Sequence, residues 1–206
     1  MSEHQERALF DSPEFEIRKK QDGKRTVRGY AAVYDSLSED LGGFREIIRK
    51  GAFDNALEEK QPVSARVQHE AGLSTVGTTE SGTLLLGADS KGLWYEVDPP
   101  DTNAGRDLVA LLERGDIRYS SFAFSVRDGG ERWNWESDPP VRELLDVNLY
   151  DVAPVDGPAY RATSAEVRAQ AAARLDQARV NRAIDETNES TDNNTVSIPE
   201  LKVWIQ

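Results

Sequence analysis

Apolar and polar residues alternate in short runs, separated by Gly, Asp and Pro, over most of the chain between Arg25 and Tyr160. Runs of this length are typical of β-strands joined by tight turns. Residues 89–92 (Asp-Ser-Lys-Gly) have the composition of a hairpin turn. Many short, evenly spaced strands predict a mainly β, α+β fold: an antiparallel β-barrel that is closed or nearly closed. Strands are expected over 26–34, 44–48, 63–69, 83–88, 92–97, 117–126 and 143–152.

Helical patterns interrupt the strands in three places. Apolar residues recur at helical spacing over 102–114, and Gly115 is a typical helix end. A shorter helix is expected over 54–59. Thr163-Ser-Ala-Glu166 fits a capping box, and an Ala/Arg/Gln-rich stretch follows it to Ile184. We therefore expect a few helices around the barrel and a helical C-terminal extension.

The changes in composition predict four segments. Residues 1–24 are polar and charged, and form a flexible leader. Residues 25–160 form the β-barrel domain, and 161–184 the helical extension. Residues 185–206 begin with a low-complexity polar run, which predicts a disordered tail with a short amphipathic end.

Charge and composition exclude several classes of function. The 206 residues include 37 acidic and 25 basic side chains, a net charge of −12, which argues against direct binding to nucleic acid or to an anionic membrane. Cys is absent, so there are no disulfides, thiolate nucleophiles or thiolate metal sites. No apolar run is long enough to span a bilayer, and the first residues lack a signal-peptide core. A soluble intracellular protein without cofactor or metal is expected.

Histidine is scarce, which narrows the choice of a general base. The chain has two, His4 and His69, and His is the side chain whose charge changes near neutral pH without help from its surroundings. His4 lies in the leader. His69 is in phase with Val63, Ala65 and Val67 on the predicted strand, at the end of an apolar face. His69 is therefore the candidate base.

The run Tyr119–Ser125 contains a candidate nucleophile. On a strand, Ser120 shares one face with Phe122 and Phe124, and this face belongs to a core. Ser121 and Ala123 lie on the opposite face, among small side chains, where a substrate backbone can approach. A serine hydroxyl needs an adjacent base, so Ser121 is the preferred nucleophile.

Asp151 is a candidate for the third member of a triad. It is in phase with Leu145, Val147 and Leu149 on the last predicted strand, and a carboxylate that continues an apolar face is costly unless it is paired. His69 can be its partner, because a third group usually orients the base in such sites. Each residue also has a purely structural interpretation. His69 can be a structural histidine, the serine pair can be solvated, and Asp151 can pair with another basic residue or cap a turn before Pro154. The residues alone allow a triad without requiring it.

Eleven short motifs together resemble one known family. They follow one another in the family's order from Arg28 to Tyr160, and each is weak alone: Arg28–Tyr34, Arg49–Phe53, Val67–Glu70, Val76–Gly77, Gly82–Leu86, Gly92–Glu96, Pro100–Thr102, Arg114–Ile117, Ser121–Phe124, Leu149–Val152 and Pro158–Tyr160. The set resembles the prohead proteases of tailed bacteriophages, the HK97-type family, which are distantly similar to herpesvirus assemblins.

The resemblance implies a catalytic set made of His69, Ser121 and Asp151. The third position is often Glu in the family, and Asp here has a shorter reach. The family commonly has Gly where Ala123 stands, and Asn where Gln68 stands. The oxyanion donor is not defined by a motif; Arg161 and a backbone N–H near Ser121 are the candidates.

The implied function is that of a serine endopeptidase of capsid maturation. Such an enzyme acts in the host cytoplasm, inside the procapsid, on the scaffolding segment of the major capsid protein and on itself, and a homodimer is possible. Neither nucleic acid nor membrane is an expected partner. Residues 163–184 can dock on scaffold or capsid as an amphipathic helix, or can form a solvated helix that covers the barrel. Residues 185–195 are an accessible region for self-cleavage.

Two other classes of function compete with the protease. The first is a non-catalytic scaffold or assembly factor on the same barrel, for which the three candidate residues are incidental. The second is a β-barrel that binds a small ligand, with Trp133 and Trp135 on a predicted loop, 129–140, at its mouth. Ser121→Ala should leave capsid assembly unchanged if the chain is a scaffold, and should leave the capsid precursor uncleaved if it is a protease. Substitution of both tryptophans separates loss of ligand binding from loss of proteolysis.

Overall fold

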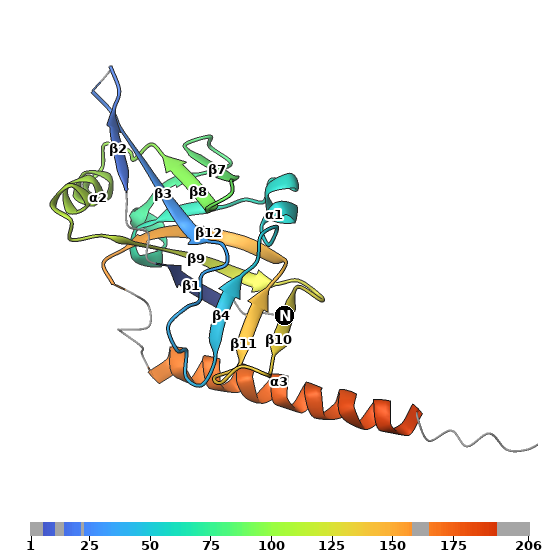
Figure 1. The fold of residues 1–206 in the computed structure, drawn as a ribbon. Coiled ribbons are helices and arrows are strands. Elements are labelled where there is room, and N and C mark those ends of the chain that lie inside the picture. The colour runs from blue at the N-terminus through green and yellow to red at the C-terminus, as the bar shows by residue number, and fades with distance from the viewer. Residues whose placement is uncertain (1–5, 11–14, 22, 158–164, 193–206) are drawn as a thin grey trace, which may run out of the picture.

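The computed structural model describes residues 6–10, 15–21, 23–157 and 165–192, which form a mainly β, α+β fold (Figure 1). The helices of this part are α1 (Asp54–Glu58), α2 (Asn103–Arg114) and α3 (Ala165–Asp192), and 3-10 turns span Val67–His69 and Gly72–Ser74. The strands are β1 (Glu6–Phe10), β2 (Glu16–Lys19), β3 (Arg25–Val33), β4 (Arg45–Ile48), β5 (Ser64–Arg66), β6 (Thr75–Thr78), β7 (Leu84–Ala88), β8 (Gly92–Val97), β9 (Tyr119–Val126), β10 (Glu131–Asn134), β11 (Val141–Leu144) and β12 (Val147–Val155).

The main core lies between two sheets. A five-stranded sheet has the order β1-β9-β12-β5-β6, and a four-stranded sheet has the order β2-β3-β8-β7. Phe122 of β9 contacts Phe53 edge-on, with ring centroids 5.3 Å apart, and Tyr95 of β8 is buried in the same cluster. The five-stranded sheet carries both Ser121 and Asp151, so this core is what holds the candidate site.

A closed barrel is not confirmed, because the strands of the described residues form three separate sheets and none closes on itself. The expectation of purely antiparallel strands is wrong. β4 pairs with β11, and β5 with β12, in parallel. Parallel neighbours need long crossover connections, and these pairs join strands that are far apart in the sequence. Local alternation predicts strands but does not reveal such partners.

Several predicted elements are confirmed. β7 and β8 form the expected antiparallel hairpin around residues 89–92. The Thr102 hydroxyl accepts a hydrogen bond from the Gly105 N–H (3.3 Å) at the start of α2, which satisfies one of the free donors of a helix N-terminus. Gly115 ends α2 with φ 77°, a left-handed conformation that favours glycine.

The ends of the described chain contain more regular structure than the sequence predicts. β1 and β2 lie in the expected leader and pair with β9 and β3. Both are edge strands, where charged side chains are usual. A polar composition therefore does not distinguish such strands from a flexible leader. α3 continues past Ile184 to Asp192, where disorder is expected. An ion pair between Arg182 and Glu186 supports this extra helix. Residues 193–206 lie outside the described residues.

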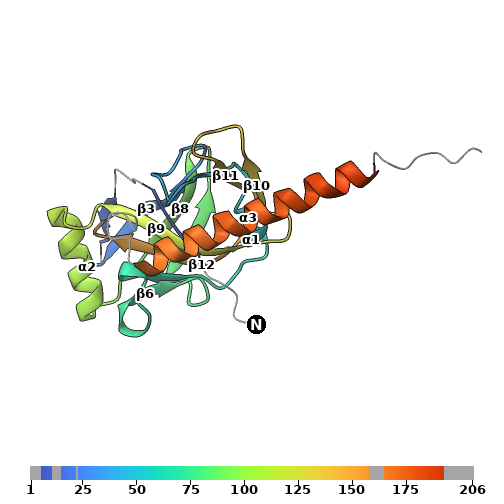
Figure 2. The same ribbon diagram turned by 90° about the horizontal axis from the view of Figure 1, so that it is seen from below.

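The predicted loop with the two tryptophans is a β-hairpin covered by α3. β10 pairs with β11, and the stacked rings of Trp133 and Trp135 have centroids 5.2 Å apart. Both indoles pack on a cluster made by Leu41, Phe44 and Leu175 of α3. Figures 1 and 2 show that α3 lies across the ends of β4, β10 and β11 and projects beyond them. The tryptophans therefore anchor a helix and do not line a mouth. None of the described helices is both long and apolar enough to cross a membrane.

The three-stranded sheet β10-β11-β4 contains buried ion pairs. Arg142 is 1% exposed and pairs with Glu46 (2.9 Å) from the neighbouring strand. Glu143, on the opposite face, accepts hydrogen bonds from Arg49 and Arg132. The hydrogen bond from Arg49 is the main reason that the pKa of Glu143 lies below its ordinary value. These pairs neutralise charge that burial would otherwise make costly.

Replacing Glu143 by Gln is expected to destabilise the fold in a pH-dependent way. A carboxyl group with a lowered pKa stabilises the folded state above its unfolded pKa, about 4.3, and this contribution is lost as the pH falls through the folded value. Loss of two charge-assisted hydrogen bonds costs roughly 2 kcal/mol at pH 7. Urea unfolding should show this difference shrinking between pH 5 and pH 3.5. Glu58→Gln, at an exposed position, is the control; equal effects of the two variants would contradict the prediction.

Candidate active site

The two adjacent serines of β9 point to opposite faces of the five-stranded sheet. The Ser120 hydroxyl is 3.0 Å from the Tyr95 hydroxyl, inside the main core. Burial raises the pKa of Tyr95, so this phenol stays neutral. Ser121 is also fully buried, but it lies on the other face, where Tyr119 packs with Ala153 and Val155. The predicted assignment of the two serines to different faces agrees with these contacts.

Asp151 shares a face with Ser121 because β12 contains a bulge. Leu149 pairs with Phe124 on the core face, whereas Asp151 pairs with Ala123, and the register shifts between Leu149 and Asp151. The predicted phase relation between Leu149 and Asp151 is therefore wrong, since one inserted residue, Tyr150, reverses it. Residues that pair across strands point to the same face. Asp151 consequently leaves the core and joins the face of small residues.

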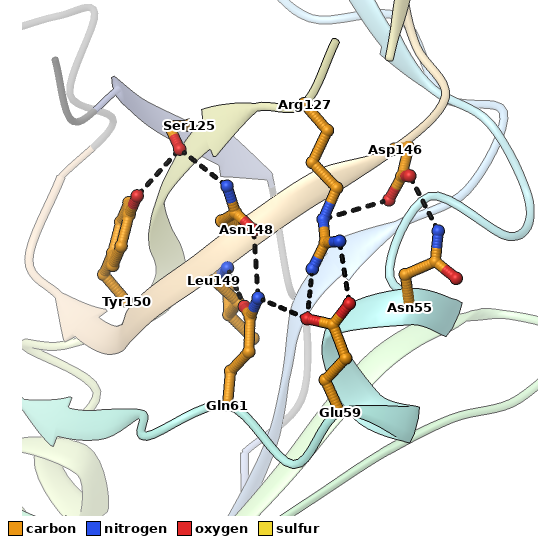
Figure 3. Close-up of polar contacts among 9 residues, drawn as sticks. All are labelled: Asn55, Glu59, Gln61, Ser125, Arg127, Asp146, Asn148, Leu149 and Tyr150. Atoms are coloured by element: carbon orange, nitrogen blue, oxygen red, sulfur yellow. Dashed lines mark hydrogen bonds and ion pairs between the residues drawn. The ribbon is translucent and has the colours of Figure 1, made fainter. Parts of the chain in front are cut away.

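A network of polar side chains fixes this bulge (Figure 3). The Tyr150 hydroxyl is 2.7 Å from the Ser125 hydroxyl, which also accepts a hydrogen bond from Asn148 (3.2 Å). Gln61 accepts a hydrogen bond from the Leu149 N–H (2.8 Å) and donates one to Asn148 (2.9 Å). A side chain thus satisfies a backbone donor of the bulged strand.

The same network is anchored to α1. Arg127 donates to Glu59 (2.8 Å) just after this helix and lies 3.6 Å from Asp146. Asn55 of α1 donates to Asp146 (2.7 Å) at the start of β12. The region before Asp151 is therefore held by side chains from α1, β9 and the segment that leads into β5, as Figure 3 shows.

His69 lies on a turn and not on a strand. β5 ends at Arg66, and the chain continues in a 3-10 turn in which Gln68 (φ 57°) and His69 (φ 60°) are left-handed. The predicted phase relation of His69 with Ala65 and Val67 is therefore wrong. Left-handed non-glycine residues cost of order 1 kcal/mol or more each and cluster at functional sites. Here they turn the imidazole towards β12.

His69 and Asp151 form a buried hydrogen-bonded pair. Nδ1 of His69 lies 2.6 Å from Oδ1 of Asp151, and the two side chains are 5% and 3% exposed. An ionised carboxylate only accepts hydrogen bonds, so Nδ1 carries the hydrogen and the lone pair of the neutral ring is on Nε2. Nε2 is buried and has no hydrogen-bond partner among the described residues. Such a nitrogen is suited to take up a proton.

The sheet places Ser121 close to this pair. Asp151 pairs with Ala123, and Ser121 lies two residues along the same face of β9. Diagonal neighbours of this kind are about 7–8 Å apart, a gap that an imidazole ring can bridge. Ala123 and Ala153 are the intervening residues on this face, and their small side chains leave room for the ring. Ser121 and Asp151 therefore lie on one face, and Asp151 holds the imidazole of His69. The structure shows no hydrogen bond between Ser121 and Nε2 of His69, which has no partner among the described residues.

Sequence reasoning missed one residue that contacts this set and one that holds the strand before it. Arg66 pairs with the second oxygen of Asp151 (Nη1 to Oδ2, 3.2 Å), and Gln61 bonds to the strand before the bulge. Both precede His69 by a few residues, but no pattern in the sequence marks them. Arg161, a candidate oxyanion donor, lies outside the described residues. Among the described side chains, no group of three or more His, Asp or Glu is arranged to hold a metal ion.

The chain belongs to the caudovirus prohead serine protease family, whose model matches residues 13–178. The resemblance found in the short motifs is thereby confirmed. Among solved structures, the bacteriophage T4 capsid assembly protease gp21 is similar in fold, with a TM-score of 0.52 and 11% sequence identity. The match covers 74% of this chain and 98% of the T4 chain. No curated protein matches the sequence significantly.

Proposed function

We propose that this chain is a serine endopeptidase of procapsid maturation that uses Ser121, His69 and Asp151 as its triad. The observation that carries the proposal is the buried hydrogen bond between Asp151 and Nδ1 of His69 (2.6 Å), on the face of the sheet to which Ser121 belongs. Membership of a serine protease family supports the same chemistry.

In this mechanism Ser121 attacks the scissile carbonyl while Nε2 of His69 takes its proton. The imidazolium then gives the proton to the leaving amine, and a water molecule repeats the sequence to release the acyl group. Asp151 holds the ring through Nδ1 and stabilises its positive charge. All three side chains are nearly inaccessible to solvent, and electrostatic interactions are stronger in such surroundings. Binding of a polypeptide substrate requires a local opening of this face.

The proposed substrates are the scaffolding segment of the major capsid protein and the chain itself, inside the procapsid in the host cytoplasm. The family and the T4 relative, a capsid assembly protease, support a role in capsid assembly. The helix α3 carries the half-exposed side chains of Val180 and Ile184 beyond the sheets, and residues 163–184 remain the proposed docking segment. Self-cleavage is proposed within 185–195. Residues 185–192 belong to α3, so the end of this helix has to unfold before it is cut. A homodimer is part of the proposal.

Co-expression with the capsid precursor tests this function. The wild-type chain should shorten the precursor, and intact-mass analysis should give the new terminus. His69→Ala should leave the precursor at full length, because the hydroxyl loses its base. A precursor shortened equally by both would exclude His69 from the reaction. A precursor shortened by neither, with particles still assembling, would favour the non-catalytic scaffold, the alternative that the fold leaves open.

A further inference from the structure

Arg66 forms an ion pair with Asp151, the carboxylate of the candidate triad. Arg66 is the last residue of β5, and β5 pairs in parallel with β12 so that Ser64 lies beside Asp151. Ala65 points into the main core, and Arg66 therefore shares the opposite face with Ser64 and Asp151. This register places Arg66 near Asp151, and the two side chains form an ion pair.

We propose that Arg66 is a positioning residue of the active site, which fixes the orientation of the Asp151 carboxylate against His69. This inference rests on the proposed function. Nη1 of Arg66 lies 3.2 Å from Oδ2 of Asp151, while Oδ1 of Asp151 lies 2.6 Å from the imidazole. Each carboxylate oxygen thus has one charged or polar partner. Rotation of an Asp carboxylate is otherwise soft, so two partners on opposite oxygens define its plane.

The environment of Arg66 fits this role better than a surface ion pair. Its side chain is 29% exposed and that of Asp151 is 3% exposed. Nε of Arg66 is buried without a hydrogen-bond partner among the described residues, and in that part of the chain Asp151 is the partner with which Arg66 forms an ion pair. A guanidinium that is desolvated in this way is held for its contact with the carboxylate.

The test measures kcat and KM for cleavage of purified capsid precursor by the full chain at pH 7.5, with Arg66→Met and Arg66→Lys. Arg66→Met should lower kcat by about 10- to 100-fold with little change in KM, as expected for misplacement of a catalytic group. Arg66→Lys keeps a cation for Oδ2 of Asp151 and should recover part of the lost kcat.

Arg49→Met is the matched control, since it removes an arginine that pairs with a buried carboxylate, Glu143, far from the triad. It should keep the wild-type kcat and KM. Arg66→Met with a wild-type kcat would overturn the role of Arg66. A loss of kcat that Arg66→Lys does not relieve, or a loss confined to KM, would overturn it as well. If the wild-type chain does not cleave the precursor, the proposed function fails and not this inference alone.

Discussion

Replacing Ser121 by Ala is expected to lower the rate of precursor cleavage by about 10⁶-fold. The reaction loses its nucleophile. In a unit of this kind, removal of the serine costs nearly as much as removal of all three members. The measurement is the initial rate of cleavage of purified capsid precursor at pH 7.5.

Ser120→Ala is the matched control for this prediction. It removes a hydroxyl from the adjacent residue, but that hydroxyl bonds to Tyr95 in the core. The expected cost is about 1–3 kcal/mol in the free energy of unfolding, with cleavage of the folded variant largely retained. Cleavage that survives in Ser121→Ala but disappears in Ser120→Ala would exchange the roles of the two residues.

Replacing Asp151 by Asn is expected to lower kcat by about 10⁴-fold. The amide nitrogen can donate to Nδ1 of His69, which favours the tautomer with hydrogen on Nε2 and so removes the lone pair that accepts the serine proton. The neutral amide also cannot balance the positive charge of the imidazolium that forms during the reaction. Asp151→Glu keeps the charge and the residue type that is frequent at this position in the family, so it should retain more activity than Asp151→Asn.

Thermal unfolding separates this catalytic effect from a structural one. Asp151 is 2% exposed and pairs with Arg66, so its amide variant will also be less stable. The rate is therefore measured at a temperature at which each variant is fully folded. Asp151→Asn with a kcat within tenfold of the wild-type value would remove Asp151 from the mechanism.

Alternation along the sequence places Ser121 on the correct face of its strand, but the phase arguments that pointed to His69 and Asp151 are wrong. Phase along β9 separates Ser121 from Ser120 because this strand is regular from Tyr119 to Val126. Phase fails for Asp151 because of the bulge at Tyr150, and for His69 because β5 ends at Arg66. A bulge depends on side chains distant in sequence, here Gln61 and Ser125, so strict alternation cannot reveal it.

The fold was predictable where contacts are local. The hairpin β7–β8 and the helix α2 follow from turn and capping residues within a few positions. The parallel pairs β4–β11 and β5–β12 depend on contacts between strands that are far apart in the chain. Arg66 was missed for the same reason. Its ion pair with Asp151 forms only after β5 and β12 have paired, and these strands are far apart in the sequence.

Covalent labelling of the nucleophile tests the central claim most directly. A preparation that cleaves the capsid precursor would be treated with a small fluorophosphonate, and the adduct would be located by peptide mass spectrometry. The proposed mechanism predicts a single adduct on Ser121 that ends cleavage and does not form in His69→Ala. An adduct on Ser120 or on another serine, or a preparation that still cleaves the precursor without forming any adduct, would contradict the mechanism.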